Sequence, residues 1–290
     1  TDDLYPEYLW KYLKSDIGLF HIRQGGKGSV RSSLSFERLQ EIEIPLPPLP
    51  EQKRIVKKIN DIADKAQKIG NQNRARIIES SSIIPSALNE VFSNTDNWQS
   101  SVLDKIAPQI TNNFVPSEYP KEEFDYLALE SIESYTSRLL EVPKVTGDKI
   151  KSSTTKFDQS NILYAKLRPY LNKVIAPNFS GIATTELISL KPDCTKIERE
   201  FLVYFLRNPK FVDEATKISS GTKMPRVNVK WLKEQKVIFP KDREEQKIII
   251  HRLNNLEIKV ELLKNELQKS DKCINALIPS VLAKAFDGEL

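Results

Sequence analysis

Lysine and arginine side chains gather in two stretches of this 290-residue chain that contain no acidic residue, residues 159–185 and residues 215–233. The side chains of interest are Lys166, Arg168, Lys173, Lys223 and Arg226. Cations without neighbouring carboxylates can neutralise phosphate groups, and arginine or lysine can also bind the edge of guanine. Charge alone predicts a solvated face with chance clustering equally well. A phosphate-facing surface and a solvated face are therefore both open interpretations at this point.

Residues that could catalyse a reaction do not form a recognisable set. The two histidines, His21 and His251, are too few and too scattered for a metal site or a proton relay. A nuclease needs clustered carboxylates to hold Mg²⁺, and the triplet Glu257-Ile258-Lys259 that has this appearance is expected on a solvated helix face. The sequence also lacks a glycine-rich phosphate loop and the Asn/Asp-Pro-Pro-aromatic motif of adenine methyltransferases. It predicts no catalytic residue and no metal site.

Composition and charge place the chain among ordinary globular proteins of about two domains. Hydrophobic residues make up 39% and charged residues 29%, and no apolar run approaches the length of a membrane span. Cys194 and Cys273 lack metal-ligand spacing and are expected to be reduced thiols, so we expect a cytoplasmic protein without a membrane partner. Residues 97–240 hold 21 lysines and arginines against 17 acidic residues and carry most of the net charge of +5.

The chain contains an internal repeat with an offset of about 194 residues. Glu51-Gln52-Lys53 recurs as Glu245-Gln246-Lys247, and Pro85 recurs as Pro279 within the same Ile-Pro-Ser motif. So long a period is not that of a solenoid and indicates two domains, each followed by a connecting element. Residues 98–199 have no counterpart before Thr1, so we expect that the front of a first domain is missing.

Both connecting elements have the apolar spacing of a coiled-coil helix. The seam residues are Ile55, Ile59, Ile62, Ala66 and Ile69 in the first, and Ile249, Leu253, Leu256, Val260, Leu263 and Leu267 in the second. We expect the two helices to pair, although packing of each on its own domain is the alternative. Polar residues such as Asn73 are expected to fix the register. Pro85 and Pro279 should kink or end the two helices at equivalent places.

The segment between the connecting helices is predicted to mix helices and strands. Residues 161–165 and 181–190 have the β-branched and apolar character of strands, and residues 198–206 have the apolar face of a helix. Residues 221–228 are predicted to form a loop. The fold class is α+β, with a mixed α/β domain and two long helices.

The order of these motifs resembles the DNA-specificity subunit of type I restriction-modification systems. The motifs are residues 161–170, residues 181–186, residues 220–226, a Pro-linked Glu-Gln-Lys helix and residues 286–290. The resemblance implies two target-recognition domains that each read half of a bipartite DNA sequence, with two helices in an antiparallel coiled coil as their spacer. It also implies a non-catalytic subunit that docks methyltransferase subunits and, through them, restriction and translocase subunits. S-adenosylmethionine, ATP and Mg are then expected only on those partners.

The resemblance divides the chain into four segments. Residues 1–46 are the end of a first target-recognition domain, 47–96 its Pro-rich linker and spacer helix, 97–240 a complete second recognition domain, and 241–290 the second spacer helix. It also places the loops at a double-stranded DNA face. The candidate contacts are Lys166, Arg168, Tyr170, Lys173, Thr184, Thr185, Lys223, Arg226 and Asn228, with Lys27, Ser29 and Arg31 in the equivalent first-copy loop. For each, an exposed or structural side chain is the competing interpretation, and for Tyr170 a core position.

Two other functions remain possible from the sequence. The chain could be the DNA-reading end of a fused restriction-methylation enzyme, whose catalytic part would precede Thr1. It could also be a coiled-coil interaction protein without a DNA role, but that hypothesis leaves the two acid-free basic stretches unexplained. Self-association, with two half-units replacing a missing domain, is a further possibility.

Overall fold

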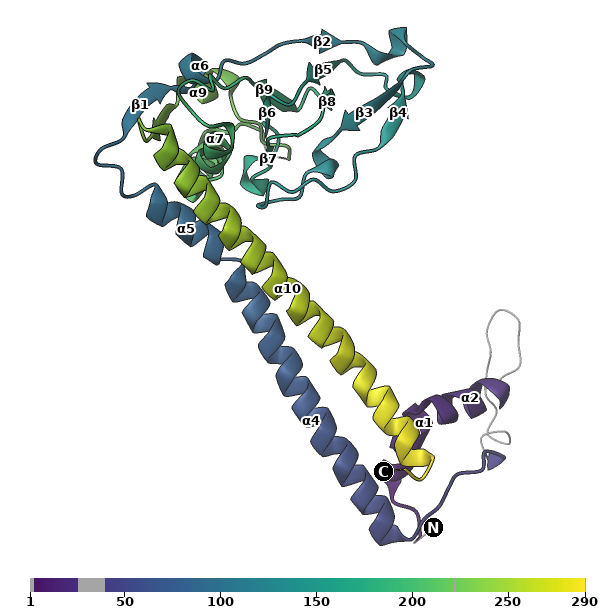
Figure 1. The fold of residues 1–290 in the computed structure, drawn as a ribbon. Helices are drawn as coiled ribbons and strands as arrows, with labels where there is room; N and C mark the ends of the chain where they lie inside the picture. The colour runs from purple at the N-terminus through teal and green to yellow at the C-terminus, as the bar shows by residue number, and fades with distance from the viewer. Residues whose placement is uncertain (1–2, 26–39, 222, 290) are drawn as a thin grey trace. The chain divides into compact units, whose positions relative to one another are not determined.

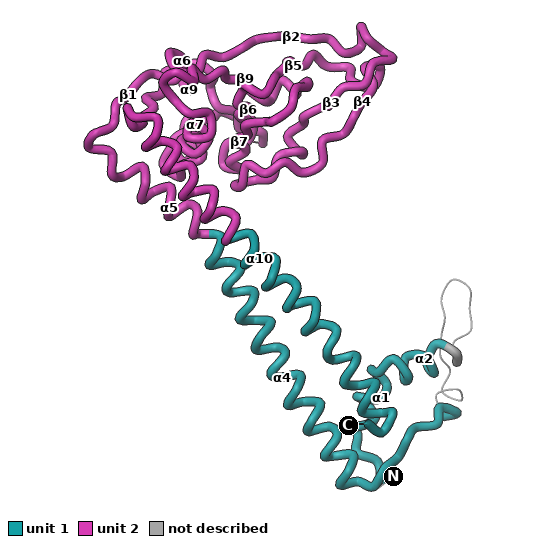
Figure 2. The backbone as a smooth tube through the Cα atoms, viewed as in Figure 1, with its two compact units in different colours: residues 1–81, 260–290 teal, residues 82–259 magenta. Residues whose placement is uncertain are grey.

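The computed structural model describes residues 3–25, 40–221 and 223–289. Packing divides the chain into two compact units, which are coloured separately in Figure 2. Unit 1 comprises residues 1–81 and 260–290, and unit 2 comprises residues 82–259. The long helix α10 (Arg243–Phe286) begins in unit 2 and ends in unit 1. The combination of helices and sheets confirms the predicted α+β fold class.

The described part of unit 2 contains three small sheets, labelled in Figure 1. β1 (Gln99–Val102) pairs antiparallel with β10 (Lys236–Phe239). The five-stranded sheet has the order β2-β5-β8-β3-β4, formed by β2 (Asn113–Phe114), β5 (Thr154–Phe157), β8 (Gly181–Thr184), β3 (Glu123–Leu127) and β4 (Lys144–Thr146). The three-stranded sheet is β7 (Val174–Ile175), β6 (Ile162–Ala165) and β9 (Leu187–Leu190), with a fully buried β6 in its centre.

The predicted single strand over residues 181–190 is in fact two strands in different sheets. β8 ends at Thr184 in the five-stranded sheet, and β9 begins at Leu187 in the three-stranded sheet. Both strands are largely buried, and the polar residues Thr185 and Glu186 between them form a turn that the predicted single strand did not allow for. The turn at Thr185 and Glu186 therefore lies at the junction of the two sheets.

The largest apolar cluster of unit 2 joins its helices to the three-stranded sheet, and a second cluster lies between that sheet and the five-stranded sheet. The predicted helix over residues 198–206 is confirmed as α7 (Arg199–Leu206), which buries Phe201 and Leu202 against Ile162 of β6 and Ile188 of β9. The other α-helices of this unit are α5 (Ile83–Val91), α6 (Leu103–Ile106), α8 (Pro209–Ile218) and α9 (Val229–Glu234). Short 3-10 helices lie at Pro116–Glu118, Leu129–Ser131, Gly147–Lys149 and Pro169–Leu171.

Unit 1 is built on α4 (Leu49–Ser80) and the second part of α10. The start of α4 packs on the end of α10, since Ile55 and Ile59 share a buried cluster with Val281 and Phe286. Figure 1 shows the two helices side by side in this unit. Because the first residues of one helix meet the last residues of the other, the pair is antiparallel. Two shorter helices, α1 (Pro6–Lys14) and α2 (Asp16–Gly25), complete the unit, and α1 adds Tyr8 and Tyr12 to its core.

Burial along the helix pair recurs every seven residues. On α4 the buried positions include Ile59, Ala66, Asn73 and Ser80, and on the unit 1 part of α10 they include Val260, Leu267 and Val281. Asn73 Nδ2 donates to Ser270 Oγ at 3.0 Å and to Asp271 Oδ1 at 2.9 Å. The predicted coiled-coil pairing is therefore present in unit 1, with Asn73 as a polar contact across it. By contrast, the predicted seam residues Ile69 and Leu263 are exposed, so only part of the predicted seam is buried.

The two proline-containing helix ends differ. In the first copy α4 ends at Ser80 and a new helix, α5, begins at Ile83, two residues before Pro85. In the second copy α10 runs through Pro279 to Phe286 without interruption. Of the two predicted outcomes, a kink or an end, the end is excluded for α10, because the helix continues past Pro279. Proline thus does not decide by itself whether the helix stops.

A glutamine near the start of each long helix fastens it to its own unit. In unit 1, Gln52 accepts from Tyr5 N at 2.8 Å and donates to Asp3 O and Pro47 O, both at 2.8 Å. In unit 2, Gln246 accepts from Glu198 N at 2.7 Å and donates to Lys196 O and Pro240 O at 3.0 and 2.8 Å. Both glutamines are fully buried.

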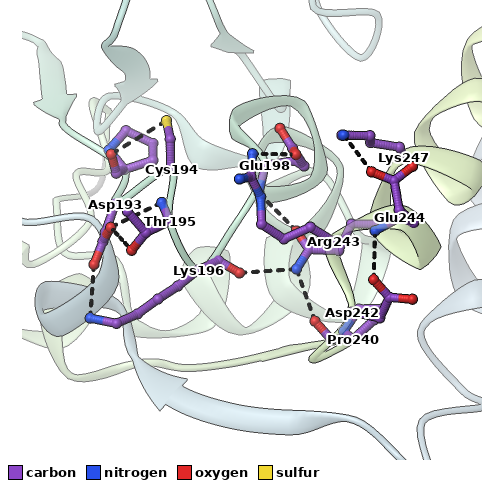
Figure 3. A network of polar contacts seen from close by, with 12 residues as sticks. Asp193, Cys194, Thr195, Lys196, Glu198, Pro240, Asp242, Arg243, Glu244 and Lys247 are labelled. Carbon is purple, nitrogen blue, oxygen red and sulfur yellow. Dashed lines mark hydrogen bonds and ion pairs between the residues drawn. The ribbon is translucent and has the colours of Figure 1, made fainter.

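The start of α10 is also held by charged residues, as Figure 3 shows. Asp242 accepts a hydrogen bond from the backbone of Glu244 at 2.9 Å, which caps the helix. Arg243 pairs with Glu198 at 2.6 Å, beside the backbone carbonyls of Lys196 and Pro240. The start of α10 is thus held by side chains just before the repeated Glu-Gln-Lys motif as well as by Gln246 within it.

Candidate nucleic-acid interface

Backbone hydrogen bonds in unit 2 join three segments that are distant in sequence. Lys166 N donates to Glu186 O at 3.0 Å, Val227 N to Lys166 O at 2.9 Å, and Arg168 N to Pro225 O at 2.7 Å. The two basic stretches of the sequence and the turn after β8 therefore meet at one place. The predicted loop over residues 221–228 is present, and it is closed by the pairing of Ser220 with Arg226.

The side chains of Lys166, Arg168 and Lys223 remain available on this surface. Lys166 is half-buried, and Arg168 and Lys223 are exposed. Within residues 3–25, 40–221 and 223–289, no hydrogen bond or ion pair engages their charged ends. Arg168 has a left-handed backbone with φ of 52°, held by its N–H bond to Pro225. A tertiary contact therefore fixes the direction in which this arginine leaves the backbone.

Arg226 differs from these cations because it has a carboxylate partner. Its Nη2 lies 2.9 Å from Glu186 Oε1, and its Nε lies 3.1 Å from both carboxylate oxygens. The hydrogen bond to Glu186, together with its charge, raises the pKa of Arg226. Arg226 thus ties the residue 220–228 loop to the turn after β8. Its predicted contact with DNA stays a prediction.

Lys173 and Asn228 have structural partners that the sequence analysis did not foresee. Lys173 Nζ donates to Leu129 O at 2.7 Å, and partial burial lowers the pKa of Lys173. The Asn228 side chain caps α9 by accepting from Lys230 N at 2.8 Å and Trp231 N at 3.4 Å. The structure therefore uses both side chains to hold loops, and their assignment to a ligand stays a prediction.

The remaining predicted residues lie around the same junction or outside the described structure. Thr185 is exposed at the turn, and Thr184 is half-buried with its hydroxyl 3.5 Å from Glu186 N. Tyr170 is 42% exposed, which excludes the competing core position, whereas Tyr164 is buried. Lys27, Ser29 and Arg31 lie outside the described residues.

Sequence reasoning missed another loop, residues 133–138, which lies next to residues 168–172. Tyr135 N donates to Asn172 O at 3.2 Å, which joins this loop to residues 168–172. The buried Arg207 lies behind both loops, where its Nη2 donates to Tyr135 O at 2.7 Å and its carbonyl accepts from Asn172 Nδ2 at 3.0 Å. The sequence gives no signal for these contacts because they join residues far apart in the chain.

Ile258 and Lys259 of the Glu257-Ile258-Lys259 triplet are exposed, as predicted, whereas Glu257 is half-buried and has partners in unit 2. Its Oε1 lies 2.8 Å from Arg207 Nη1, and its Oε2 accepts from the Tyr204 hydroxyl at 3.1 Å. The triplet thus contributes a structural carboxylate rather than a nuclease motif. In the described part of the chain, no group of three or more His, Cys, Asp or Glu residues could hold a metal ion. Nor does any described helix have the length and apolar character to cross a membrane.

Comparison with known proteins assigns the chain to a family. Residues 2–79 and 95–270 match the family of type I restriction modification DNA specificity domains, and the chain belongs to this family. This confirms the resemblance drawn from the sequence motifs. The matched residues include both long helices for most of their length and the whole of the junction described above.

Individual relatives are specificity subunits. The chain is 30% identical over 201 residues to the type I restriction enzyme EcoDI specificity subunit of Escherichia coli, covering 69% of this chain and 44% of that protein. It is 24% identical over 314 residues to the MjaVIII specificity subunit of Methanocaldococcus jannaschii, covering 93% of this chain and 67% of that protein. The fold is similar to the crystal structure of the HsdS subunit from Thermoanaerobacter tengcongensis, with a TM-score of 0.67, 20% identity and coverage of 100% and 72%. The chain therefore spans 44% to 72% of the length of these proteins.

Proposed function

We propose that this chain is a DNA-binding, non-catalytic component of a type I restriction-modification complex, with residues 97–240 as the domain that reads one half of a bipartite target. Family membership supports the specificity role. The observation that carries the proposal is the convergence of Lys166, Arg168 and Lys223, without partners among the described residues, where three loops are joined by backbone hydrogen bonds. Residues 1–46 would belong to the domain for the other half-site.

The composition of this surface suits a DNA duplex. Unpaired lysines and arginines supply the sequence-independent affinity for phosphates, which falls steeply with salt. Discrimination between bases needs side chains that reach base edges from a fixed backbone, and Arg168 has such a backbone. Thr185 and Tyr170 add an exposed hydroxyl and an exposed ring beside it. We assign phosphate binding to Lys166 and Lys223 and base reading to Arg168.

The partners follow from the same proposal. The long helices, residues 47–96 and 241–290, would act as the spacer and dock methyltransferase subunits, and restriction subunits would join through these. S-adenosylmethionine, ATP and Mg would then be held by the partners. This assignment agrees with the cytoplasmic location expected from the sequence.

The test compares two triple variants of the whole chain. Lys166→Ala, Arg168→Ala and Lys223→Ala together remove the three available cations. Lys144→Ala, Lys149→Ala and Lys151→Ala remove the same charge from exposed positions in or just after β4 and the adjoining 3-10 helix. Sequences are selected from a randomised duplex pool, and binding is then measured over a range of salt concentrations.

The first variant should lose the selected sequence preference and lower the salt slope by about 0.9 per phosphate contact removed. The second should keep the preference, because its lysines lie outside the loop junction. Equal losses in both variants would show that only net charge matters and would overturn the assignment of this surface. Thermal melts of both proteins establish that they are folded.

A further inference from the structure

Arg207 is the point where the two strained loops of unit 2 meet. It is 2% exposed, its guanidinium donates to Tyr135 O, and its own carbonyl accepts from Asn172 Nδ2. Through these bonds it touches the main chain of residues 133–138 and the side chain that ends the residue 168–172 loop. A single buried residue thus contacts both loops, residues 133–138 through its side chain and residues 168–172 through its main-chain carbonyl.

The two loops concentrate unfavourable conformations. Among the described non-glycine residues, those with positive φ are Tyr135 at 69°, Ser137 at 58°, Arg168 at 52° and Asn172 at 48°. Ser137 Oγ and Asn172 Oδ1 are moreover buried without a hydrogen-bond partner in the described structure. Strained backbone and unsatisfied polar atoms are costly, and they persist where the surroundings force them and where function uses them.

The tips of both loops present aromatic side chains to solvent. Tyr135 is 56% exposed and Tyr170 is 42% exposed, and Arg168 lies on the same loop as Tyr170. A rigid ring beside an available cation is the combination that contacts bases and sugars, because the ring supplies contact area at little cost in entropy. Residues 133–138 therefore extend the candidate interface on the side of residues 168–172.

An ion pair between the buried Arg207 and the partly exposed Glu257 connects this arrangement to helix α10. Arg207 Nη1 lies 2.8 Å from Glu257 Oε1, and the Tyr204 hydroxyl donates to Glu257 Oε2 and to Asn254 Oδ1 at 2.6 Å. A buried ion pair is no efficient source of stability, since apolar residues of similar volume do as well. It does, however, fix the direction of the guanidinium that holds the loops.

We propose that Arg207, oriented by Glu257, is a positioning residue that holds loops 133–138 and 168–172 together as one DNA-reading surface, on which Tyr135 contacts the duplex beside Arg168. This inference rests on the proposed function and extends it to a loop and to residues that the sequence analysis did not include.

The experiment uses four variants of the whole chain. Glu257→Ala removes the orienting carboxylate, and Glu257→Gln is the conservative variant that still offers an acceptor oxygen to Arg207. Tyr135→Ala removes the ring and leaves the ion pair. Glu198→Ala is the matched control, because it breaks another partly buried arginine pair of unit 2, that with Arg243, which does not touch the loops.

The first readout is hydrogen–deuterium exchange without DNA. In Glu257→Ala, peptides covering residues 133–138 should exchange faster, and residues 168–172 should follow through the bond from Tyr135 N to Asn172 O, while peptides covering β6 and β9 stay protected. Glu257→Gln should recover part of the protection, and Glu198→Ala should leave both loops as in the wild type. Unchanged exchange in Glu257→Ala would overturn the positioning role.

The second readout is the preference for duplexes that the wild type selects from a randomised pool. Glu257→Ala and Tyr135→Ala should each lower the ratio of selected to unselected binding by about tenfold, within the range of one lost base contact. Glu198→Ala should keep the ratio. If Glu257→Ala exchanged faster but both Glu257→Ala and Tyr135→Ala kept the wild-type sequence preference, the reading role of loop 133–138 would be overturned. A wild type that selects no sequence would instead overturn the proposed function, and exchange would still decide whether Arg207 positions the loops.

Discussion

The two copies of the repeat keep their anchoring contacts and differ almost everywhere else. Gln52 and Gln246 make the same three hydrogen bonds, to one backbone N–H and two carbonyls at equivalent places in their own units. Such a bond set satisfies backbone groups that the start of a helix and its linker would otherwise leave buried and unpaired. The Glu-Gln-Lys landmark thus reflects a need for one buried amide rather than for surface charge.

The far end of each long element also makes an equivalent contact, but with the other copy. Phe92, at the end of the first element, packs edge-on against Phe201 and Phe205 in unit 2. Phe286, at the end of the second, packs edge-on against Tyr8 and Tyr12 in unit 1. Each compact unit is therefore assembled from pieces of both copies. Because both ends of each element are fixed by packing, the offset stays at 194 residues from Gln52 and Gln246 to Phe92 and Phe286.

The two copies differ at positions whose side chains make contacts found in one copy only. Asn73 corresponds by the repeat offset to Leu267, so one helix contributes a polar seam residue and the other an apolar one. Arg207 and Glu257 correspond to Lys14 and Ala63. The first copy therefore has no equivalent of the Arg207–Glu257 ion pair that lies beside loops 133–138 and 168–172. The anchors define the common framework, and the remaining positions are free to specify register and recognition.

Replacing either anchoring glutamine should have the largest effect on stability. Gln246→Ala and Gln52→Ala each leave a buried N–H and two carbonyls without their partner, and each should lower the free energy of unfolding by about 3 kcal/mol. Gln67→Ala, at an exposed position of α4, is the control and should change it by less than about 0.5 kcal/mol. Urea unfolding followed by circular dichroism measures all three. If Gln52→Ala lowered the free energy of unfolding and Gln246→Ala left it unchanged, the two glutamines would not be equivalent anchors.

The sequence predicts periodic elements well and loop chemistry poorly. The seven-residue recurrence of Ile59, Ala66 and Asn73 is a local pattern, so the helix pair could be foreseen. The partner of Arg226 could not be foreseen, because Glu186 lies 40 residues away in the sequence and only the fold brings the two together. Asn228 is an intermediate case, since an asparagine just before a short helix is an N-cap signal that could have been recognised.

Residues set by tertiary contacts escaped prediction for the same reason. Lys173 has the composition of a phosphate ligand, but the fold places Leu129 O within 2.7 Å of its ammonium group. The loop 133–138 has no basic stretch to attract notice, and its relation to residues 168–172 depends on the buried Arg207. Composition singles out the loops as a candidate surface, whereas burial and pairing decide which of their cations are available.

A smaller effect should follow from giving the first helix the seam residue of the second. Asn73→Leu removes the bonds to Ser270 and Asp271 and places an apolar side chain at a buried position, as Leu267 does in the other copy. Polar seam residues fix register at a cost in stability, so the variant should be more stable by about 1 kcal/mol and less specific in its pairing. Urea unfolding gives the stability, and exchange along α4 reports the pairing. A loss of stability would mean that the Asn73 bonds contribute more than apolar packing.

The smallest effect concerns why α4 stops and α10 does not. Pro85 and Pro279 remove the same helical hydrogen bond, so the cause must lie in the residues before them. Ser80 and Ser81 hydroxyls donate to Ile77 O at 2.8 and 3.0 Å, and side-chain bonds of this kind compete with the helix. The corresponding residues of α10 are Ile274 and Asn275, and Ala276 takes the place of Ser82.

The double variant Ser81→Asn and Ser82→Ala gives the first copy two residues of the second while leaving the buried Ser80 in place. It should extend the helix across residues 81–83, with a gain in stability of about 0.5 kcal/mol from the better helix propensity of alanine. Slower amide exchange at residues 81–83 is the measurement, and Ser86→Ala, at an exposed position already inside α5, is the control. If exchange at residues 81–83 stayed fast, the serines would not cause the interruption, and the buried Ser80, which corresponds to Ile274, would remain as the difference that ends the helix.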